Sequence, residues 1–252
     1  MGKLIAVWGS PGSGKTTFSV KLAEALNSRS KKSAGHKTLV VFTDLTSPVV
    51  PVVFPNRKSE DIYSLGSVLV KTDLSPNVIF SNTMFIKDRS DLGDLGYLGY
   101  TAGENKFSYP ALTEDKIRAF EEQLRLMADF VIVDCVSNPE ESLLSKLLLQ
   151  DADKVIRVCT PNLKCLSYHQ SQTQMLTRFG YLPEDHIGVL NITESEQQYS
   201  ASDLKPRFGR IEFTVPFSST IREQYMVGSL TEQTKDKKFN SAFESIKERL
   251  VR

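Results

Sequence analysis

Cysteine is scarce in this sequence, and its distribution excludes a disulfide-stapled fold. Three cysteines (Cys135, Cys159 and Cys165) occur in 252 residues, they form no CxxC pair, and each lies in or beside an apolar run. Cysteines in such surroundings usually behave as small buried hydrophobic groups. We therefore expect this protein in a reducing, cytoplasmic environment.

Long apolar segments and an excess of charge of one sign are also missing. No run of about 18 apolar residues occurs, and the apolar start reaches Gly, Pro and Ser too early for a signal peptide. The 31 basic and 30 acidic residues leave a net charge of +1. These features exclude a membrane span, export, and a surface that is basic throughout for nucleic acid.

What remains is the composition of a soluble globular protein, with 40% hydrophobic and 24% charged residues. Short apolar β-type runs alternate with longer stretches of helical periodicity. This alternation predicts one α/β domain over residues 1–252, with a doubly wound, mostly parallel sheet between two layers of helices. The predicted strands are residues 4–8, 38–43, 77–81, 130–134, 154–159, 186–191 and 211–215, and the predicted helices are residues 15–27, 114–128, 139–150, 166–179 and 239–251.

Residues 87–110 interrupt the alternation. They read KDRSDLGDLGYLGYTAGENKFSYP, with glycine at every third position in the middle of the segment. Because repeated glycine weakens helices and strands alike, we expect a long surface loop. Its aromatic residues would suit contact with a protein partner, and a flexible insertion is the alternative. These residues are Tyr97, Tyr100, Phe107 and Tyr109.

A phosphate-binding motif follows the first predicted strand. Residues 9–16 read GSPGSGKT and match G-x-x-x-x-G-K-[ST] between an apolar strand and an amphipathic helix. In such a loop the glycines let the backbone wrap phosphates, and main-chain N–H groups and the helix dipole point inward. Lys15 is expected at the β- and γ-phosphates and the Thr16 hydroxyl at Mg²⁺. The loop residues expected at the nucleotide are Gly9, Ser10, Gly12, Ser13, Gly14, Lys15, Thr16 and Thr17.

Two aspartates close apolar strands and complete the candidate catalytic set with Lys15. Asp134 ends the run DFVIVD and is expected to hold Mg²⁺ together with Thr16. Asp44 ends the run TLVVFTD. Its carboxylate would lie behind the water molecules on the metal, or it would cap a turn; we favour the first interpretation.

The order of these elements resembles the MinD/ParA family of P-loop ATPases. The likeness spans residues 1–230 through the phosphate loop, the strand ending at Asp44, DFVIVDCVSNP at residues 129–139, DADKVIRVCTPNLKCL at residues 151–166, IGVLNI and VPFSSTIREQYMVGSL. The sequence is most similar in character to an atypical bacterial branch associated with pilus assembly and secretion. The resemblance implies the fold of that family, with ATP and Mg²⁺ bound. It also implies a nucleotide-dependent switch that positions or assembles a larger apparatus.

The same resemblance assigns further residues. It places Asn191 where the family reads adenine, and Pro216 and Phe217 beside the base. The chain reads NITE from Asn191, which is not the guanine motif N-K-x-D. The γ-phosphate would order residues 135–139 and favour an ATP-dependent, face-to-face homodimer or a partner-binding surface.

Two departures from the family pattern concern hydrolysis. Family members commonly carry a lysine after the first glycine of the loop, where it reaches the partner's phosphate; here the residue is Ser10. The strand-two motif is typically D-x-D, and the second acid is here Thr46. Losing one such group costs phosphoryl transfer about 10³- to 10⁵-fold. We expect nucleotide binding with slow hydrolysis.

The C-terminal segment, residues 235–252, is predicted to form an amphipathic helix. Phe239, Phe243, Ile246 and Leu250 share one face of it. The apolar face would dock on the protein body, which we favour, or touch a membrane surface and make the protein peripheral there. The basic cluster Lys205, Arg207 and Arg210 predicts at most weak, salt-sensitive contact with DNA.

Two other functions remain open. The run GSPGSGKTT also resembles the loop of small-molecule kinases, but residues 87–110 contain one arginine, Arg89, instead of an arginine-rich lid. The second alternative is a scaffold protein that does not hydrolyse nucleotide and has kept only the nucleotide pocket or only the fold.

Overall fold

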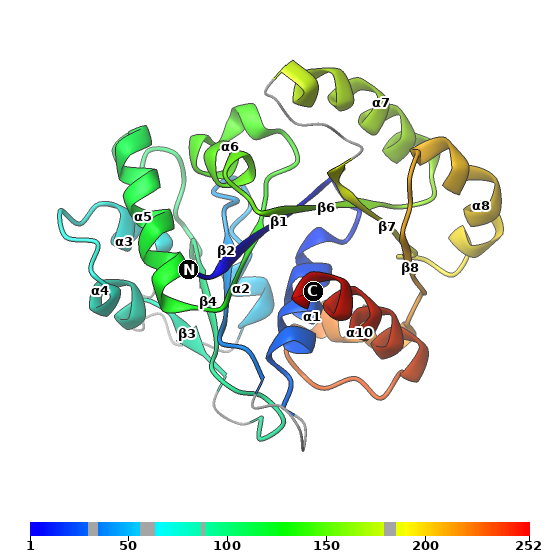
Figure 1. The fold of residues 1–252 in the computed structure, drawn as a ribbon, viewed down its shortest axis with the longest axis horizontal. Coiled ribbons are helices and arrows are strands. Elements are labelled where there is room, and N and C mark those ends of the chain that lie inside the picture. The colour runs from blue at the N-terminus through cyan, green and yellow to red at the C-terminus, as the bar shows by residue number, and fades with distance from the viewer. Residues whose placement is uncertain (30–34, 56–63, 87–88, 179–184) are drawn as a thin grey trace.

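The structure is a computed structural model that describes residues 1–29, 35–55, 64–86, 89–178 and 185–252. In this part of the chain, eight strands form one sheet in the order β3-β4-β2-β5-β1-β6-β7-β8 (Figure 1). Neighbouring strands run parallel except for the antiparallel edge pair β3 and β4. The strands are β1 (Lys3–Gly9), β2 (Thr38–Phe42), β3 (Met84–Phe85), β4 (Leu95–Gly99), β5 (Phe130–Asp134), β6 (Lys154–Cys159), β7 (Ile187–Asn191) and β8 (Phe213–Val215).

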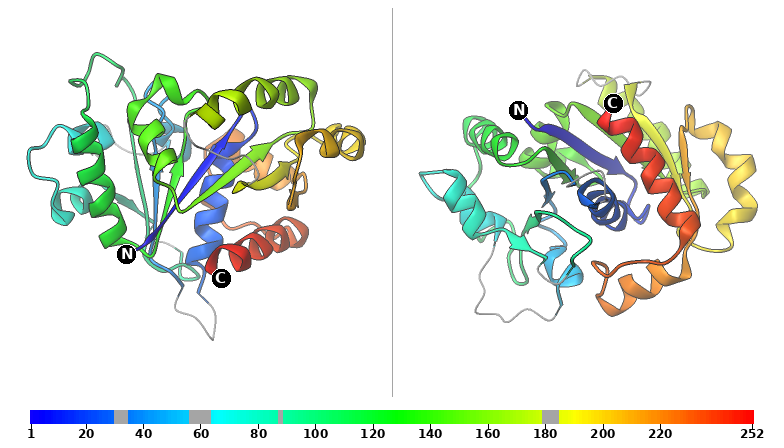
Figure 2. Two further views of the ribbon diagram at one scale, coloured as in Figure 1. Left: turned by 45° about the horizontal axis from the view of Figure 1, so that its top comes forward. Right: turned by 60° about the horizontal axis from the view of Figure 1, so that its bottom comes forward.

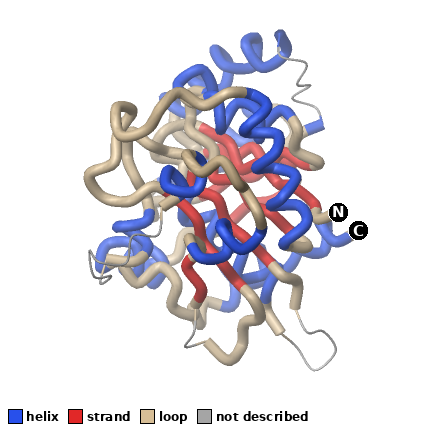
Figure 3. The backbone as a smooth tube through the Cα atoms, turned by 90° about the vertical axis from the view of Figure 1, so that its left-hand side faces the viewer, coloured by secondary structure: helices blue, strands red, loops and turns tan. Residues whose placement is uncertain are grey.

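Both faces of the sheet are covered, which confirms the predicted doubly wound architecture. Side chains of β1 alternate between the faces: Ile5 and Val7 join one apolar cluster, and Leu4 and Trp8 join the other. A strand that is buried on both faces needs a continuous apolar run, as its sequence shows. Figure 3 shows the strands at the centre of the molecule with helices on both sides.

In the described residues, α1, α5, α6, α7 and α10 are the expected helices, whereas α2, α3, α4, α8 and α9 were not predicted as helices. Within the described residues they are α1 (Lys15–Asn27), α2 (Val50–Val53), α3 (Leu65–Leu69), α4 (Pro76–Ser81), α5 (Glu114–Met127), α6 (Leu143–Gln150), α7 (Leu163–Arg178), α8 (Gln197–Leu204), α9 (Ser219–Val227) and α10 (Lys237–Val251), with short 3₁₀ turns η1 (Pro139–Glu141) and η3 (Lys205–Phe208).

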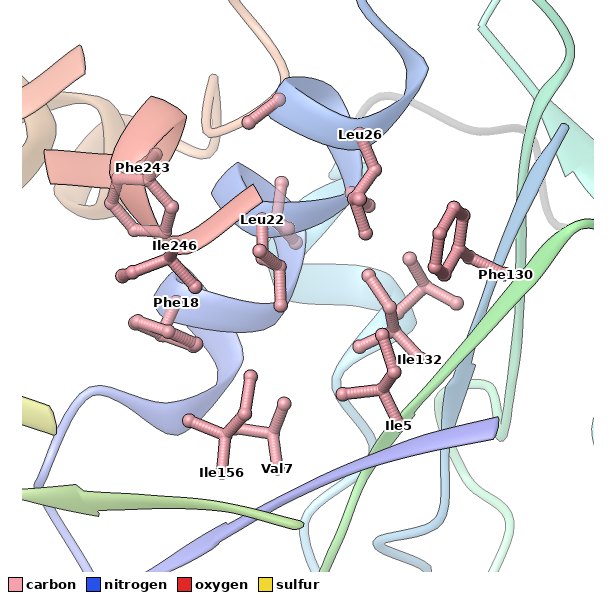
Figure 4. Close-up of a cluster of buried hydrophobic side chains, with 14 of the residues drawn as sticks. Ile5, Val7, Phe18, Leu22, Leu26, Phe130, Ile132, Ile156, Phe243 and Ile246 are labelled. Carbon is pink, nitrogen blue, oxygen red and sulfur yellow. The ribbon is translucent and has the colours of Figure 1, made fainter. Parts of the chain in front are cut away.

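Helix α10 docks on the protein body beside α1, as the favoured interpretation of the C-terminal segment predicted (Figure 2). Its four apolar residues, Phe239, Phe243, Ile246 and Leu250, are at most 4% exposed. The Phe243 ring lies 5.1 Å from that of Phe18 on α1, and both lie over the β1 side chains (Figure 4). This face is therefore occupied by the core and is not available to a lipid surface. No helix in the described segments is long and apolar enough to cross a bilayer.

The segment predicted as a strand at residues 77–81 is instead helix α4. Pro76 occupies its first turn, where the missing N–H costs no hydrogen bond. Ile79 is the buried residue of this helix, whereas Phe80 is 60% exposed. A short apolar run fits a buried strand or one turn of helix equally well, and here the sheet position next to β2 is taken by β4.

Strand β4 lies inside the segment predicted as a loop, so that prediction was wrong for residues 95–99; residues 87 and 88 lie outside the described part. Its glycines allow neighbouring elements to approach closely. A Cβ atom on Gly96 would lie 2.6 Å from Thr83 Cγ2, and one on Gly99 would lie 2.9 Å from Val50 Cγ2. Glycine weakens a strand in isolation, but here the tight packing requires it.

The predicted aromatic contact surface of this segment is also partly wrong. Tyr97 is fully buried and stacks on Phe42 at 6.1 Å, and Tyr100 is 5% exposed. Tyr109 packs over Gly66, so closely that a Cβ on that glycine would lie 2.0 Å from the ring. Phe107 is 85% exposed and Tyr109 is partly exposed, so these two of the four are accessible at the surface.

Candidate functional site

The phosphate loop connects β1 to α1, and its glycines have different structural roles. Gly12 and Gly14 have φ angles of 73° and 77°, a region that side-chain-bearing residues rarely adopt. A Cβ on Gly14 would also lie 2.6 Å from Asn191 Nδ2. Gly9 instead lets β1 pass close to β6, because a Cβ there would lie 2.2 Å from the Val158 oxygen.

Lys15 joins the loop to the segment that follows β5. Its ammonium donates to the Ser10 carbonyl at 3.1 Å and to Ser137 Oγ at 2.8 Å. Burial lowers the pKa of Lys15, and the nearby Asp134 carboxylate opposes that shift. A partly desolvated ammonium with two neutral oxygen partners is well suited to bind a phosphate anion, which would restore its lost solvation.

Asp134 lies directly beside the start of α1. Its side chain accepts hydrogen bonds from Thr16 Oγ1 at 2.6 Å and from Ser19 Oγ at 3.4 Å. Burial raises the pKa of Asp134 to about 6, and Lys15 is the main opposing influence. The buried Asp134 carboxylate and the Thr16 hydroxyl lie at the end of the phosphate loop, and both are oxygen ligands of the kind that Mg²⁺ accepts. Ser19 was not predicted, although it lies one helical turn after Thr16 on the same face.

The buried charge of Asp134 predicts a stability cost in the absence of nucleotide and metal. Its folded-state pKa lies above the ordinary value of 3.8, so folding favours the protonated form and becomes less favourable as pH rises through about 4 to 6. Asp134→Asn is therefore expected to raise the free energy of unfolding at neutral pH by about 1–3 kcal/mol. The gain should shrink as pH falls towards about 4.

Urea unfolding of the nucleotide-free protein across that pH range measures this effect. Asp203→Asn, at an exposed position, is the matched control and should change little. An Asp134→Asn protein that is less stable than wild type at neutral pH would show that the ionised carboxylate stabilises the fold.

Asp44 caps a turn, as the alternative interpretation predicted, and its place behind metal-bound water stays a prediction. Its Oδ1 atom accepts hydrogen bonds from the N–H groups of Thr46 and Ser47, both at 2.9 Å, so it caps the turn after β2. Its charge also contributes to the raised pKa of Asp134, so its carboxylate acts on the same site. Thr46 belongs to that capped turn.

A cavity of about 430 Å³ opens from the phosphate loop. Asn191, Pro216 and Phe217, which the resemblance assigned to adenine, line it together with Gly12, Gly14, Lys15, Thr16 and Thr17. Asn191 Nδ2 donates to the Ser13 carbonyl at 2.9 Å, and this hydrogen bond links the end of β7 to the phosphate loop. Further walls come from α9 and α10, which sequence reasoning did not assign: Ile221, Arg222, Tyr225, Met226, Phe239 and Phe243.

Three of the predicted nucleotide-binding residues support the loop instead of lining the cavity. Gly9 packs against β6, and Ser13 is fully buried, where its hydroxyl donates to the Ser10 carbonyl at 2.9 Å. Ser10 is 2% exposed. Its hydroxyl therefore does not project towards a partner, as the family's lysine at this position would.

Known structures share this fold. A ParA family ATPase from Chlorobium tepidum has a TM-score of 0.75 and 14% identity, over 97% of this chain and 98% of that one. A septum site-determining MinD complexed with Mg-ADP from Pyrococcus horikoshii has a TM-score of 0.68 and 18% identity, over 99% and 96%. A plasmid partition protein from Borrelia burgdorferi bound to AMPPNP has a TM-score of 0.72 and 14% identity, over 100% and 99%.

These neighbours confirm the expected MinD/ParA-type P-loop fold. No protein-family model matches the sequence. No curated protein matches it either. The narrower likeness to pilus-assembly and secretion ATPases stays a prediction.

Proposed function

We propose that this protein binds Mg-ATP and acts as a nucleotide-dependent switch, with slow hydrolysis, that positions or assembles a larger cellular apparatus. The observation that carries the proposal is the convergence of Lys15, Thr16 and Asp134 at the phosphate loop, where the cavity opens. Structural neighbours complexed with Mg-ADP or bound to AMPPNP support a nucleotide in the same fold.

The residues fit a magnesium nucleotide chemically. Thr16 and Asp134 would hold the ion, which when bound neutralises charge on the β- and γ-phosphates. Lys15 would bind the phosphates, while Gly12 and Gly14 leave the loop backbone free to surround them. Pro216 and Phe217 would contact the base.

Ser137 offers a route from the phosphates to the protein surface. Its carbonyl accepts hydrogen bonds from Trp8 Nε1 at 3.0 Å and from the Tyr168 hydroxyl, and its own hydroxyl accepts from Lys15. Lys15 would exchange this hydroxyl for a phosphate oxygen when its ammonium turns towards the nucleotide. Residues 135–139 would then change partners, and the signal would reach α6 and α7.

Slow hydrolysis follows from the groups around the loop. Ser10 is buried, and Thr46 is part of the turn that Asp44 caps, so neither supplies the lysine or the second acid of the family pattern. An ATP-bound homodimer, the cytoplasmic location and a protein partner that contacts Phe107 are parts of the same proposal.

Calorimetry and light scattering test the function directly. We expect the wild-type protein to bind ATP and ADP with Mg²⁺ more tightly than GTP, to release phosphate slowly, and to gain mass with ATP. Absence of nucleotide binding would favour the scaffold alternative. Faster phosphate transfer to a small acceptor than to water would favour the kinase.

A further inference from the structure

Gln197 is the first residue of α8, and its side chain connects the ends of two strands beside the phosphate loop. Its Oε1 atom accepts hydrogen bonds from the Thr193 N–H at 3.0 Å, the Thr193 hydroxyl at 3.2 Å and the Thr160 hydroxyl at 2.9 Å. Thr160 directly follows β6, and Thr193 lies two residues after β7. These three hydrogen bonds, the Gln197 clamp, therefore join the carboxyl ends of β6 and β7 to the start of α8.

The donors of the clamp fix the orientation of the Gln197 amide. A backbone N–H can only donate, so the atom that faces the Thr193 N–H must be the side-chain oxygen and not the nitrogen. Thr160 is 2% exposed, so water has little access to its hydroxyl. Without the Gln197 oxygen, this hydroxyl would keep only the Thr193 hydroxyl at 3.5 Å, and the Thr193 N–H would lose its acceptor.

The segment that the clamp holds, residues 191–193, packs against the phosphate loop. The Asn191 side chain donates to a carbonyl of the loop at 2.9 Å. A Cβ atom on Gly14 would lie 2.6 Å from Asn191 Nδ2 and 3.2 Å from Thr193 Cγ2, so even one added carbon atom would have too little room. A shift of this segment would therefore change its fit against the loop.

The same segment forms part of the wall of the candidate nucleotide cavity. Asn191, Ile192 and Thr193 all line the cavity. Gln197 is half-buried and lies behind them, bonded to Thr193. We therefore expect Gln197 to act on a ligand through the residues that it holds, and not by contact.

A backbone hydrogen bond joins this segment to the other wall of the cavity. The Ile192 N–H donates to the Val215 carbonyl at 3.0 Å, and Val215 ends β8. Pro216, which comes next, lines the cavity on the side expected to meet the base. The position of residues 191–193 therefore affects both the phosphate loop and the base side of the cavity.

We propose that Gln197 is a positioning residue for the base side of the nucleotide cavity, an inference that rests on the proposed nucleotide function. Its oxygen fixes the backbone of residues 191–193 before a ligand binds. Asn191 can then meet the base with little further loss of conformational freedom, which strengthens binding. The phosphates would instead meet Lys15 and Thr16, so their binding depends much less on the clamp.

Amide hydrogen exchange of the nucleotide-free, full-length protein tests the clamp itself. Gln197→Ala should raise the exchange rate of the Thr193 amide by about tenfold, because its acceptor is lost. Gln197→Glu should keep the protection, since a carboxylate oxygen accepts the same hydrogen bonds. Gln198→Ala, at the exposed neighbouring position, is the matched control and should exchange like wild type. Protection of Thr193 that is unchanged in Gln197→Ala would overturn the proposal.

Calorimetry with ATP and with inorganic tripolyphosphate, both with Mg²⁺, tests the effect on binding. Gln197→Ala should weaken ATP binding by about tenfold and tripolyphosphate binding by less than about twofold, because tripolyphosphate has no base to position. The preference for ATP over GTP should narrow in the same variant. At high ionic strength, where its added charge is screened, Gln197→Glu should bind ATP more tightly than Gln197→Ala.

The comparison of the two ligands separates this role from a general structural defect and from the nucleotide function. Equal losses for ATP and tripolyphosphate in Gln197→Ala would show damage to the whole site and would overturn the positioning role. Unchanged ATP affinity in that variant would overturn it as well. A wild-type protein that binds neither ligand would overturn the nucleotide function, even where hydrogen exchange at Thr193 shows that the clamp is intact.

Discussion

Lys15→Ala is expected to weaken binding of Mg-ATP by about 10²- to 10³-fold. The ammonium lies inside the loop with the carbonyl of Ser10 and the hydroxyl of Ser137 as its partners, and it is the positive charge placed to meet the phosphates. Its removal leaves phosphate oxygens in a desolvated loop without a charged partner. Calorimetric titration of both proteins with ATP and Mg²⁺ measures the loss.

The variant should remain folded, so weaker binding would not be a result of unfolding. Burial lowers the pKa of Lys15, so the charged side chain is itself costly to the folded state. Lys238→Ala, at an exposed position of α10, is the matched control and should bind ATP like wild type. A loss of less than about tenfold for Lys15→Ala would contradict the assigned phosphate site.

Phe243→Ala is expected to destabilise the protein by about 3–5 kcal/mol. This ring is 3% exposed and lies 5.1 Å from Phe18 and 4.9 Å from Phe239, so its loss leaves a cavity between α1 and α10. Because Phe18, Phe239 and Phe243 also line the candidate nucleotide cavity, the substitution should loosen that wall as well. Urea unfolding at neutral pH measures the change.

A control on the same helix separates packing from helix propensity. Ser241→Ala, at an exposed position, should change the free energy of unfolding by less than about 0.5 kcal/mol. If Phe243→Ala cost under about 1 kcal/mol and instead abolished flotation with liposomes, the apolar face of α10 would belong to a membrane contact.

The phosphate loop could be predicted from sequence because its chemistry is local. Gly12, Gly14, Lys15 and Thr16 lie within a few residues of one another, and the flanking strand and helix follow from short-range periodicity. Asp134 was also predictable, since the end of a buried parallel strand lies at the same edge of the sheet as the loop.

Contacts between distant segments were not visible in the sequence. The glycines of β4 indicate a loop when read alone, and only the approach of Thr83 and Val50 makes a strand with small residues the stable solution. In the same way, Tyr97 looked like a surface aromatic until Phe42 covered it. The hydrogen bond from Asn191 at the end of β7 to the Ser13 carbonyl joins residues 178 positions apart, which no spacing rule relates.

By itself the sequence determined the alternation of strands and helices and the position of the phosphate loop, because periodicity and glycine placement act over a few neighbouring residues. Only the tertiary structure decided which apolar faces are buried, as for α10, and which polar groups share one environment, as for Ser19 and Asp134. Burial and hydrogen bonding depend on what the rest of the chain brings alongside, and that is a property of the whole fold.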